Sequence, residues 1–313
     1  MEDSTKMDAT HHAFNSTQAV GKQVFGKIPG RIAEIHLVSS HPEVYEPCDD
    51  SFALVDALLA DRTNLLEHRP MLCMEVGCGS GYVITSLALM LGQEANGLYY
   101  LATDINPHAA RVTTETLEVH GVHAEVISTD IALGLEKRLT GLVDVMVVNP
   151  PYVPTPECEV GGAGITSAWA GGENGRSVID KILPVADSLL SENGWLYMVT
   201  VVSNNPSQIC AQMWEKGFAS RIAVQRSTEE ESLHVIKFWR DLDRLAEAKA
   251  AAATTRTISS KIIESVLSQF PSSHFGAVTA MTIDDHFKGV YILILNACYG
   301  FFKIFLLHLI YLR

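Results

Sequence analysis

Short apolar runs and helix-like stretches alternate along the middle of the chain. Apolar runs at residues 71–76, 98–103, 124–129, 143–149 and 194–202 predict five strands. Helices are predicted between them, near residues 82–91, 107–120 and 175–190. Because strands alternate with helices, we predict an α/β fold built on a parallel, doubly wound sheet.

The segments that flank this alternation extend the pattern at both ends. Residues 1–31 are polar and glycine-rich without any period, which predicts a disordered extension. Apolar positions at helical spacing in 50–60 predict a helix that can lie over a ligand. After one more helix near 206–216, the segments 220–226 and 232–239 flank an acidic turn and predict a terminal hairpin.

Length and charge restrict the class of protein. The 313 residues suffice for one large domain, which we place at 32–240, followed by an atypical tail at 241–313. The formal net charge is −13 and no run of lysine and arginine occurs, so a face that grips nucleic-acid phosphates is not expected. The cysteines lack zinc-ligand spacing and the N-terminus lacks a signal-peptide layout. We therefore predict reduced thiols, no metal and a cytoplasmic location, with the nucleus left open.

The tetrapeptide Asn149-Pro150-Pro151-Tyr152 closes the apolar run 143–148. Two consecutive prolines remove two backbone donors and fix φ at both positions, so this segment is stiff and its carbonyls stay free. The side-chain oxygen of Asn149 and the carbonyl of Pro150 are then two acceptors on a rigid lip. Such a pair suits a planar –NH2 group, which it orients while leaving the π face of the nitrogen open. In isolation, the same tetrapeptide also fits an ordinary proline-rich turn after a strand.

Three earlier strand ends carry ligand-type residues as well. Gly77, Gly79 and Gly81 follow the first strand and allow a tight turn that a ligand can approach at the start of a helix. Asp104 ends the second strand and can accept both hydroxyls of a ribose, and Asp130 ends the third and can accept from the exocyclic amine of adenine. Each acid alone could cap the helix that follows, but caps do not explain the whole series.

The order of these segments resembles that of a known family. They read E-V-G-C-G-S-G, T-D-I-N-P, S-T-D-I and V-V-N-P-P-Y, joined by V-Y-E-P-C-D-D-S-F at 44–52 and G-I-T-S-A-W-A-G-G-E-N-G-R at 164–176. Over about residues 32–239 the chain resembles the S-adenosylmethionine-dependent N5-glutamine (HemK-like) methyltransferases. It looks most like the eukaryotic members that methylate the GGQ glutamine of the class I peptide-chain release factor. NPPY is also found in adenine-N6 DNA methyltransferases, so the combination of segments carries the resemblance.

The resemblance implies a Rossmann-like class I methyltransferase, with a seven-stranded, mostly parallel sheet that ends in an antiparallel hairpin. It implies methyl transfer from S-adenosylmethionine to the side-chain amide nitrogen of a glutamine. The implied cofactor-binding residues are Tyr45 and Ser51 on the methionine side, Glu75, Gly77 and Gly79 in the pocket, Asp104 at the ribose, Asp130 and Ile131 at the adenine, and Asn149. The implied catalytic residues are Asn149, Pro150, Pro151 and Tyr152.

The resemblance also implies two protein partners. One is the release factor as substrate, and the other is a small zinc-binding activator subunit that covers an apolar sheet edge to form a heterodimer. Other functions stay open. An adenine-N6 methyltransferase on nucleic acid would need a basic face, and a binding module without turnover would need a broken NPPY or lost acids, but neither feature is seen. A lysine methyltransferase could use the same lip for an amine.

A long glycine-rich loop at 153–174 follows the tetrapeptide and exceeds the usual length of such connections. Its Trp169 and Gly171-Gly172 can form a wall beside the acceptor, or the loop can be ordinary surface with its tryptophan folded back on the core. The tail departs from the family. Residues 241–257 are alanine-rich and helix-prone, and 289–312 are almost wholly apolar. As a helix, 289–312 would be long enough for a membrane anchor; alternatively, it is an atypical C-terminus, such as a splice product, without catalytic role.

Overall fold

The computed structural model describes residues 32–92, 97–162, 164–227, 232–244 and 246, together with the backbone of two strands at 290–298 and 301–309. The predicted disordered extension 1–31 lies outside the described residues, as does most of the predicted helix 241–257. Of the apolar tail segment 289–312, only the backbone of these two strands is described.

Seven strands form one sheet in the order β3-β2-β1-β4-β5-β7-β6. They are β1 (Leu72–Val76), β2 (Tyr99–Asp104), β3 (Glu125–Ser128), β4 (Val143–Val148), β5 (Leu190–Val201), β6 (Phe218–Ser227) and β7 (Ser232–Arg240). Strands β1 to β5 pair in parallel, whereas β7 runs antiparallel to both β5 and β6. This confirms the predicted mostly parallel sheet with a terminal antiparallel hairpin.

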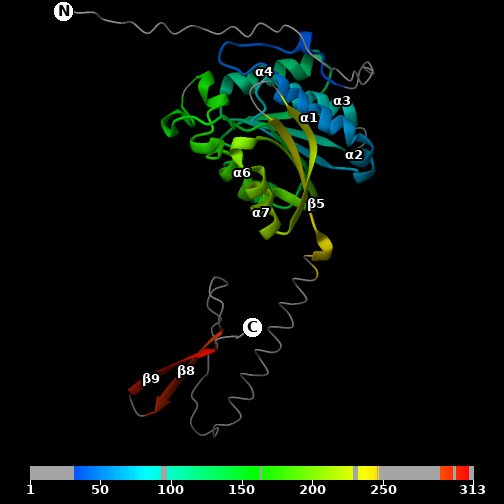
Figure 1. Ribbon diagram of the computed structural model, residues 1–313. Helices are drawn as coiled ribbons and strands as arrows, with labels where there is room; N and C mark the ends of the chain where they lie inside the picture. Colours follow the sequence, from blue (N-terminus) through cyan, green and yellow to red (C-terminus); the bar gives the residue numbers. More distant parts are fainter. Residues whose placement is uncertain are drawn as a thin grey trace, which may run out of the picture.

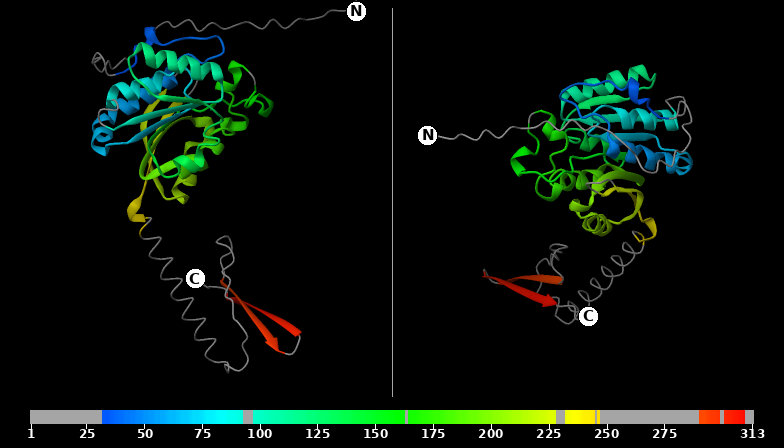
Figure 2. Two further views of the ribbon diagram at one scale, coloured as in Figure 1. Left: turned by 180° about the vertical axis from the view of Figure 1, so that it is seen from behind. Right: turned by 45° about the horizontal axis from the view of Figure 1, so that its top comes forward.

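Helices cover both faces of this sheet (Figure 1). The helices are α1 (Asp49–Ala60), α2 (Arg62–His68), α3 (Tyr82–Leu91), α4 (Pro107–Val119), α5 (Glu136–Leu139), α6 (Ile179–Leu189) and α7 (Pro206–Glu215). Helices α1 to α4 lie on one face and α6 and α7 on the other (Figure 2). The sequence pattern missed α2, a short helix that follows α1 directly.

Helix α6 begins four residues later than the predicted start at 175. The residues before it form a short 3₁₀ helix, Glu173–Gly175, in which Asn174 has φ 57° and Gly175 has φ 66°. Two residues in the left-handed region cannot continue a right-handed helix, so the loop after NPPY extends to the start of α6. Two further 3₁₀ turns, Glu157–Glu159 and Ile165–Ala168, lie within this loop.

The core is densest around the central strand β4. Its residues from Val145 to Val148 are completely buried. A central parallel strand is covered by helices on both faces, which explains its unbroken apolar run. The run ends at the carboxyl edge of the sheet, where the ends of β1, β2 and β4 lie next to one another. The predicted ligand-type residues are therefore gathered at one edge.

Where the apolar tail segment is described it is extended, so the helix that was one of the alternatives for it is not found there. Strands β8 (Val290–Cys298) and β9 (Phe301–Leu309) pair with each other in antiparallel fashion and, among the described residues, with no other strand. The two strands contain three isoleucines and three phenylalanines, which favour extended backbone. No helix in the described part of the chain has the length and apolar character needed to cross a membrane.

Removing the tail should leave the domain built on the seven-stranded sheet intact. The seven-stranded sheet ends with β7 at Arg240 and draws no strand from beyond it within the described residues. A chain that ends after residue 245 is expected to keep its melting temperature and the methyl transfer that the family resemblance implies, and to gain solubility because an apolar stretch is deleted. Calorimetry and a transfer assay on both lengths check this, and a shortened chain that unfolds would contradict it.

A buried ion-pair cluster joins α1 to the antiparallel part of the sheet. Asp61, which is 3% exposed, accepts from the Lys237 ammonium and the Tyr197 hydroxyl at 2.5 Å each, and Arg221 lies 3.1 Å away. Burial raises the pKa of Asp61, but hydrogen bonds from Lys237, Tyr197 and Asn64 outweigh burial and bring the pKa down to about 2. The folded protein therefore favours the charged carboxylate.

This lowered pKa predicts an acid-sensitive contribution to stability. The unfolded chain binds the proton near the ordinary pKa of 3.8, before the folded chain does at about 2. The contribution of Asp61 to the free energy of unfolding should hence hold steady above about pH 4 and fall by about 2 kcal/mol as the pH drops towards 2. Urea titrations across this range test the expectation. Asp61→Asn should lack this component, and an identical acid dependence in the variant would count against the assignment.

Candidate active site at the carboxyl edge of the sheet

The glycine turn after β1 is tied to the neighbouring strand. The backbone amides of Gly77 and Cys78 both donate to the carbonyl of Thr103 in β2, at 2.8 and 3.0 Å. Gly77 and Gly79 have φ values of 76° and 52°, which glycine adopts without strain. A methyl group added at Gly79 would meet no heavy atom within 4 Å. The turn is thus fixed on the sheet side and open at Gly79, where a ligand can approach the backbone.

Glu75 lies behind this turn. Its side chain is 1% exposed, and its carboxylate accepts from the backbone amide of Ile84 in the first turns of α3 at 2.9 Å. Burial raises the pKa of Glu75 well above its ordinary value. Glu75 therefore fixes the start of α3 against the end of β1, and shapes the pocket by holding the glycine turn between them. Its role towards a cofactor stays a prediction.

Asp104 reaches from the end of β2 to the glycine turn. One carboxylate oxygen accepts from the Gly79 amide at 2.9 Å and the other from the Asn106 amide at 2.8 Å. Burial raises the pKa of Asp104, and these two backbone bonds partly oppose that shift. Each carboxylate oxygen has a second lone pair, so the group can still accept from a diol. The structure brings Asp104 and Gly79 together, as the predicted strand order requires.

The segment after β3 contains a strained residue. Asp130 is exposed, and the next residue, Ile131, has φ 52°. A branched side chain in the left-handed region costs on the order of 1–3 kcal/mol and persists where its surroundings hold it. The Thr103 hydroxyl provides such a hold by donating to the Ile131 carbonyl at 2.7 Å. The proposed contacts of these two residues with adenine stay predictions.

The NPPY segment follows β4 beside the glycine turn. A methyl group placed on Gly77 would lie 3.9 Å from the backbone carbonyl oxygen of Asn149, so the two turns are neighbours. The side-chain oxygen of Asn149 is buried and finds no hydrogen-bond donor among the described residues. An unsatisfied buried acceptor is costly unless a ligand supplies the donor. Asn149 is therefore poised to receive an N–H group.

Asp50 is a site residue that the sequence pattern did not reveal. It is 4% exposed, and one of its oxygens accepts from the hydroxyls of Tyr152 at 3.1 Å and Tyr45 at 3.4 Å. Its other oxygen accepts from the backbone amide and hydroxyl of Ser51, at 2.5 and 3.1 Å. Asp50 thus connects three predicted residues, of which Tyr152 lies far away in sequence. Acids in the first turn of a helix usually interact with its dipole, and so its local context gave no sign of this role.

The long loop folds back on the NPPY segment. The Val153 amide donates to the Trp169 carbonyl at 3.0 Å, and the Gly171 amide donates to the Val153 carbonyl at 2.8 Å. Trp169 is half-buried, whereas Gly171 and Gly172 are buried. A methyl group on Gly171 would lie 2.8 Å from the carbonyl oxygen of Pro151. The backbone of the loop therefore lies directly against the lip, and the place of the Trp169 side chain beside the acceptor stays a prediction.

Comparison with known proteins agrees with this geometry. The family profile described as "Methyltransferase small domain" matches residues 48–163, which contain the glycine turn, both acids and NPPY. The human protein named "Methyltransferase HEMK2" is 47% identical over 196 residues, which cover 63% of this chain and 89% of the human one. The chain belongs to the HemK-like N5-glutamine methyltransferase family.

Two further relatives cover a similar share of this HemK-like chain. The fission yeast Schizosaccharomyces pombe protein named as the catalytic subunit mtq2 of the eRF1 methyltransferase is 33% identical, over 63% of this chain and 90% of its own. A solved structure of the E. cuniculi Mtq2–Trm112 complex matches with 28% identity and a TM-score of 0.45, over 64% of this chain and 99% of that one. Both relatives are thus matched along most of their own length.

The contact between Asp50 and Tyr152 gives a direct test of the HemK-like site. Asp50→Asn keeps the volume but lacks the charge that accepts the Tyr152 hydroxyl, and a bond to a charged group is worth about 1.5 kcal/mol or more. We expect kcat at saturating substrates to fall about tenfold. Asp49→Asn is the matched control, because Asp49 is exposed in the same helical turn. An equal loss in the two variants would contradict a specific role for Asp50.

Proposed function

We propose that this HemK-like enzyme methylates the side-chain amide nitrogen of a glutamine, in the GGQ segment of a class I peptide-chain release factor. The observation that carries the proposal is the buried oxygen of Asn149, which lacks a donor among the described residues at the carboxyl end of β4. The names of two relatives support the substrate class. The yeast relative is named an eRF1 methyltransferase subunit, and a 28% identical protein of Methanocaldococcus jannaschii is named a putative protein N5-glutamine methyltransferase.

The residues at the glycine turn fit S-adenosylmethionine. Asp104 has acceptor capacity left for the two ribose hydroxyls, and the open side of Gly79 admits close approach to the backbone. The cluster of Tyr45, Asp50 and Ser51 lies at the start of α1 and is suited to the amino-acid end of the cofactor. When bound, the cofactor supplies an electrophilic methyl group on a sulfonium.

The chain's own part in the reaction is to orient the acceptor. The –NH2 of the glutamine donates one hydrogen to the Asn149 oxygen and one to the Pro150 carbonyl, which fixes the amide plane and exposes the face of the nitrogen. An amide nitrogen is a weak nucleophile because its lone pair is delocalised, and so most of the rate enhancement must come from positioning. Tyr152 packs beside the acceptor. The nitrogen gains a methyl group and loses one proton to solvent, without a general base.

We further propose that a small zinc-binding activator subunit covers strand β3, and that the enzyme works in the cytoplasm. This docking place is supported by the position of β3 at one edge of the sheet. Among the described strands, β3 pairs only with β2. Val126 and Ile127 are half-buried there. An exposed edge strand readily accepts a segment of another chain, since its outer backbone groups are unpaired.

The decisive experiment is mass spectrometry after incubation with isotopically labelled S-adenosylmethionine. The enzyme, with and without the activator subunit, is offered release factor, a release factor whose GGQ glutamine is replaced by asparagine, and duplex DNA. We expect one methyl group on the GGQ glutamine and none on the replaced factor. Label on lysine side chains or on adenine would contradict the proposal and identify the alternative substrate.

A further inference from the structure

One buried amide holds the back of the acceptor site together. Asn204 follows β5 in the short 3₁₀ helix Val202–Asn204, and its side chain is completely buried. Its nitrogen donates to the carbonyl of Tyr152 at 2.8 Å, and to the carbonyls of Asn174 and Gly175 at 3.0 and 3.3 Å. Its oxygen accepts from the Val201 amide at 2.8 Å. One side chain thus links the end of NPPY to the end of the long loop.

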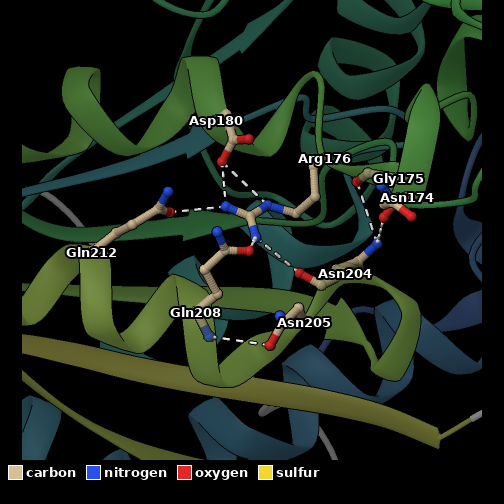
Figure 3. A network of polar contacts seen from close by, with 8 residues as sticks. All are labelled: Asn174, Gly175, Arg176, Asp180, Asn204, Asn205, Gln208 and Gln212. Carbon is tan, nitrogen blue, oxygen red and sulfur yellow. Dashed lines mark hydrogen bonds and ion pairs between the residues drawn. The ribbon is translucent and has the colours of Figure 1, made fainter.

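Arg176 anchors the same loop end from the other side (Figure 3). Arg176 is buried, and its guanidinium donates to the carboxylate of Asp180 in α6. The same group donates to the side-chain oxygens of Gln208 and Gln212 in α7, at 3.2 and 2.8 Å. It also donates to the Asn204 carbonyl at 3.0 Å. The loop end is therefore fixed to two helices of the scaffold.

The backbones joined by Asn204 are in direct contact. A methyl group on Gly175 would overlap the Tyr152 carbonyl oxygen and the Asn204 amide nitrogen. Only glycine leaves room for this approach, and at φ 66° only glycine adopts the conformation without strain. Because no space remains between the loop end and the lip, a displacement of one must displace the other.

The neighbouring residue Asn205 shows what an ordinary capping role looks like here. Its φ is 53°, and its side-chain oxygen accepts from the Gln208 amide at the start of α7. The side chain of Asn204 instead bonds to the end of β5, to the lip and to the end of the long loop. The oxygen of Asn204 thus caps the short 3₁₀ helix Val202–Asn204, whereas its nitrogen bonds only to the lip and to the end of the long loop.

We infer that Asn204 is a positioning residue of the methyl-acceptor site. Its amide sets the Tyr152 carbonyl, and with it the spacing of the Asn149 and Pro150 acceptors, against a loop end that Arg176 anchors to α6 and α7. The inference rests on the proposed function in one respect, that the acceptor is held on the lip. We call the contacts of Asn204 with Tyr152, Asn174 and Gly175 the Asn204 clamp. Cofactor binding does not depend on the Asn204 clamp, since the glycine turn and Asp104 form contacts of their own.

The test replaces the donor and keeps the shape. Asn204→Asp retains an oxygen that can accept from the Val201 amide. Its other carboxylate oxygen cannot donate to the three carbonyls and is repelled by them. We expect kcat for methyl transfer to fall at least about tenfold while the Kd of S-adenosylmethionine changes less than about twofold, because misplacement by about 1 Å costs up to about a hundredfold in rate. Hydrogen exchange at the Val153, Thr155 and Gly171 amides should become faster, with strands β1 and β4 still protected.

Asn205→Ala is the matched control. It removes a helix cap one residue away and strains the backbone, so it should lower the melting temperature without changing kcat. If Asn204→Asp does not fold, Arg176→Lys serves as the second variant, because lysine lacks the forked geometry of the guanidinium. It too should lower kcat while leaving the Kd of S-adenosylmethionine nearly unchanged. Loss of kcat in proportion to melting temperature across all three variants would overturn the inference.

The outcomes also separate this inference from the proposed function. If the wild-type enzyme leaves the release factor unmethylated, only the proposed function is contradicted. Hydrogen exchange at the loop amides in Asn204→Asp then tests whether Asn204 holds the lip and the loop end together. A wild-type enzyme that methylates the factor, with a folded Asn204→Asp variant equally active, contradicts the Asn204 clamp alone.

Discussion

Asn149→Ala is expected to lower kcat for methyl transfer by about 10²–10³-fold while leaving the affinity for S-adenosylmethionine within about twofold. The substitution deletes the buried oxygen that has no donor in the described structure, and so removes the hydrogen bond that would orient the acceptor. Loss of one preorganised polar group in an active site typically has an effect of this size. The cofactor affinity should survive because Asp104 and the glycine turn are tied to each other and to β2.

Calorimetry for the cofactor and a transfer assay for turnover measure the two quantities separately. Asn149→Asp is the informative companion variant, because it retains side-chain oxygens that can accept from an N–H group and should keep more activity than Asn149→Ala. An alanine variant that turns over at nearly the wild-type rate would remove the lip from the mechanism and leave NPPY as a structural turn.

Asp104→Ala is expected to weaken cofactor binding at least about a hundredfold. The variant loses the two bonds that the carboxylate is placed to accept from a ribose, and bonds to a charged group contribute about 1.5–3 kcal/mol each. At saturating cofactor, kcat should fall far less than the affinity does, since the acceptor lip is untouched. Binding isotherms and rates measured across cofactor concentrations separate these effects.

Asp144→Ala is a close control for Asp104→Ala. Asp144 likewise accepts from backbone amides, those of Met71 and Leu72 at 2.8 and 3.2 Å, but it does so at the amino end of the sheet. Both variants should therefore lower the melting temperature, while only the change at Asp104 should alter the cofactor Kd. An unchanged Kd in Asp104→Ala would mean that this acid only secures the glycine turn and the start of α4.

Elements with strong local signals were predictable. Helix α3 has the predicted bounds of residues 82 and 91, and the strands of the parallel sheet lie within a few residues of their predicted positions. Glycines that need positive φ, consecutive prolines and the period of apolar positions act over a few neighbouring residues, so they can be read from the chain alone. The tail is the exception. Its apolar composition suits a helix or a strand, so the pattern of apolar positions could not decide between the two.

Local patterns in the chain were therefore enough to predict the order of strands and helices, the family, and the four strand ends that meet at the site. Which side chains support these strand ends became clear only from the folded structure. Asp50 lies 102 positions from Tyr152 and Asn204 lies 52 positions from it. No local pattern marks an acid or an amide for such contacts, because the packing of distant elements determines their partners. The position of β7 between β5 and β6 likewise depends on how distant segments pack. Buried hydrogen-bonding groups must find partners, and the folded chain assigns them.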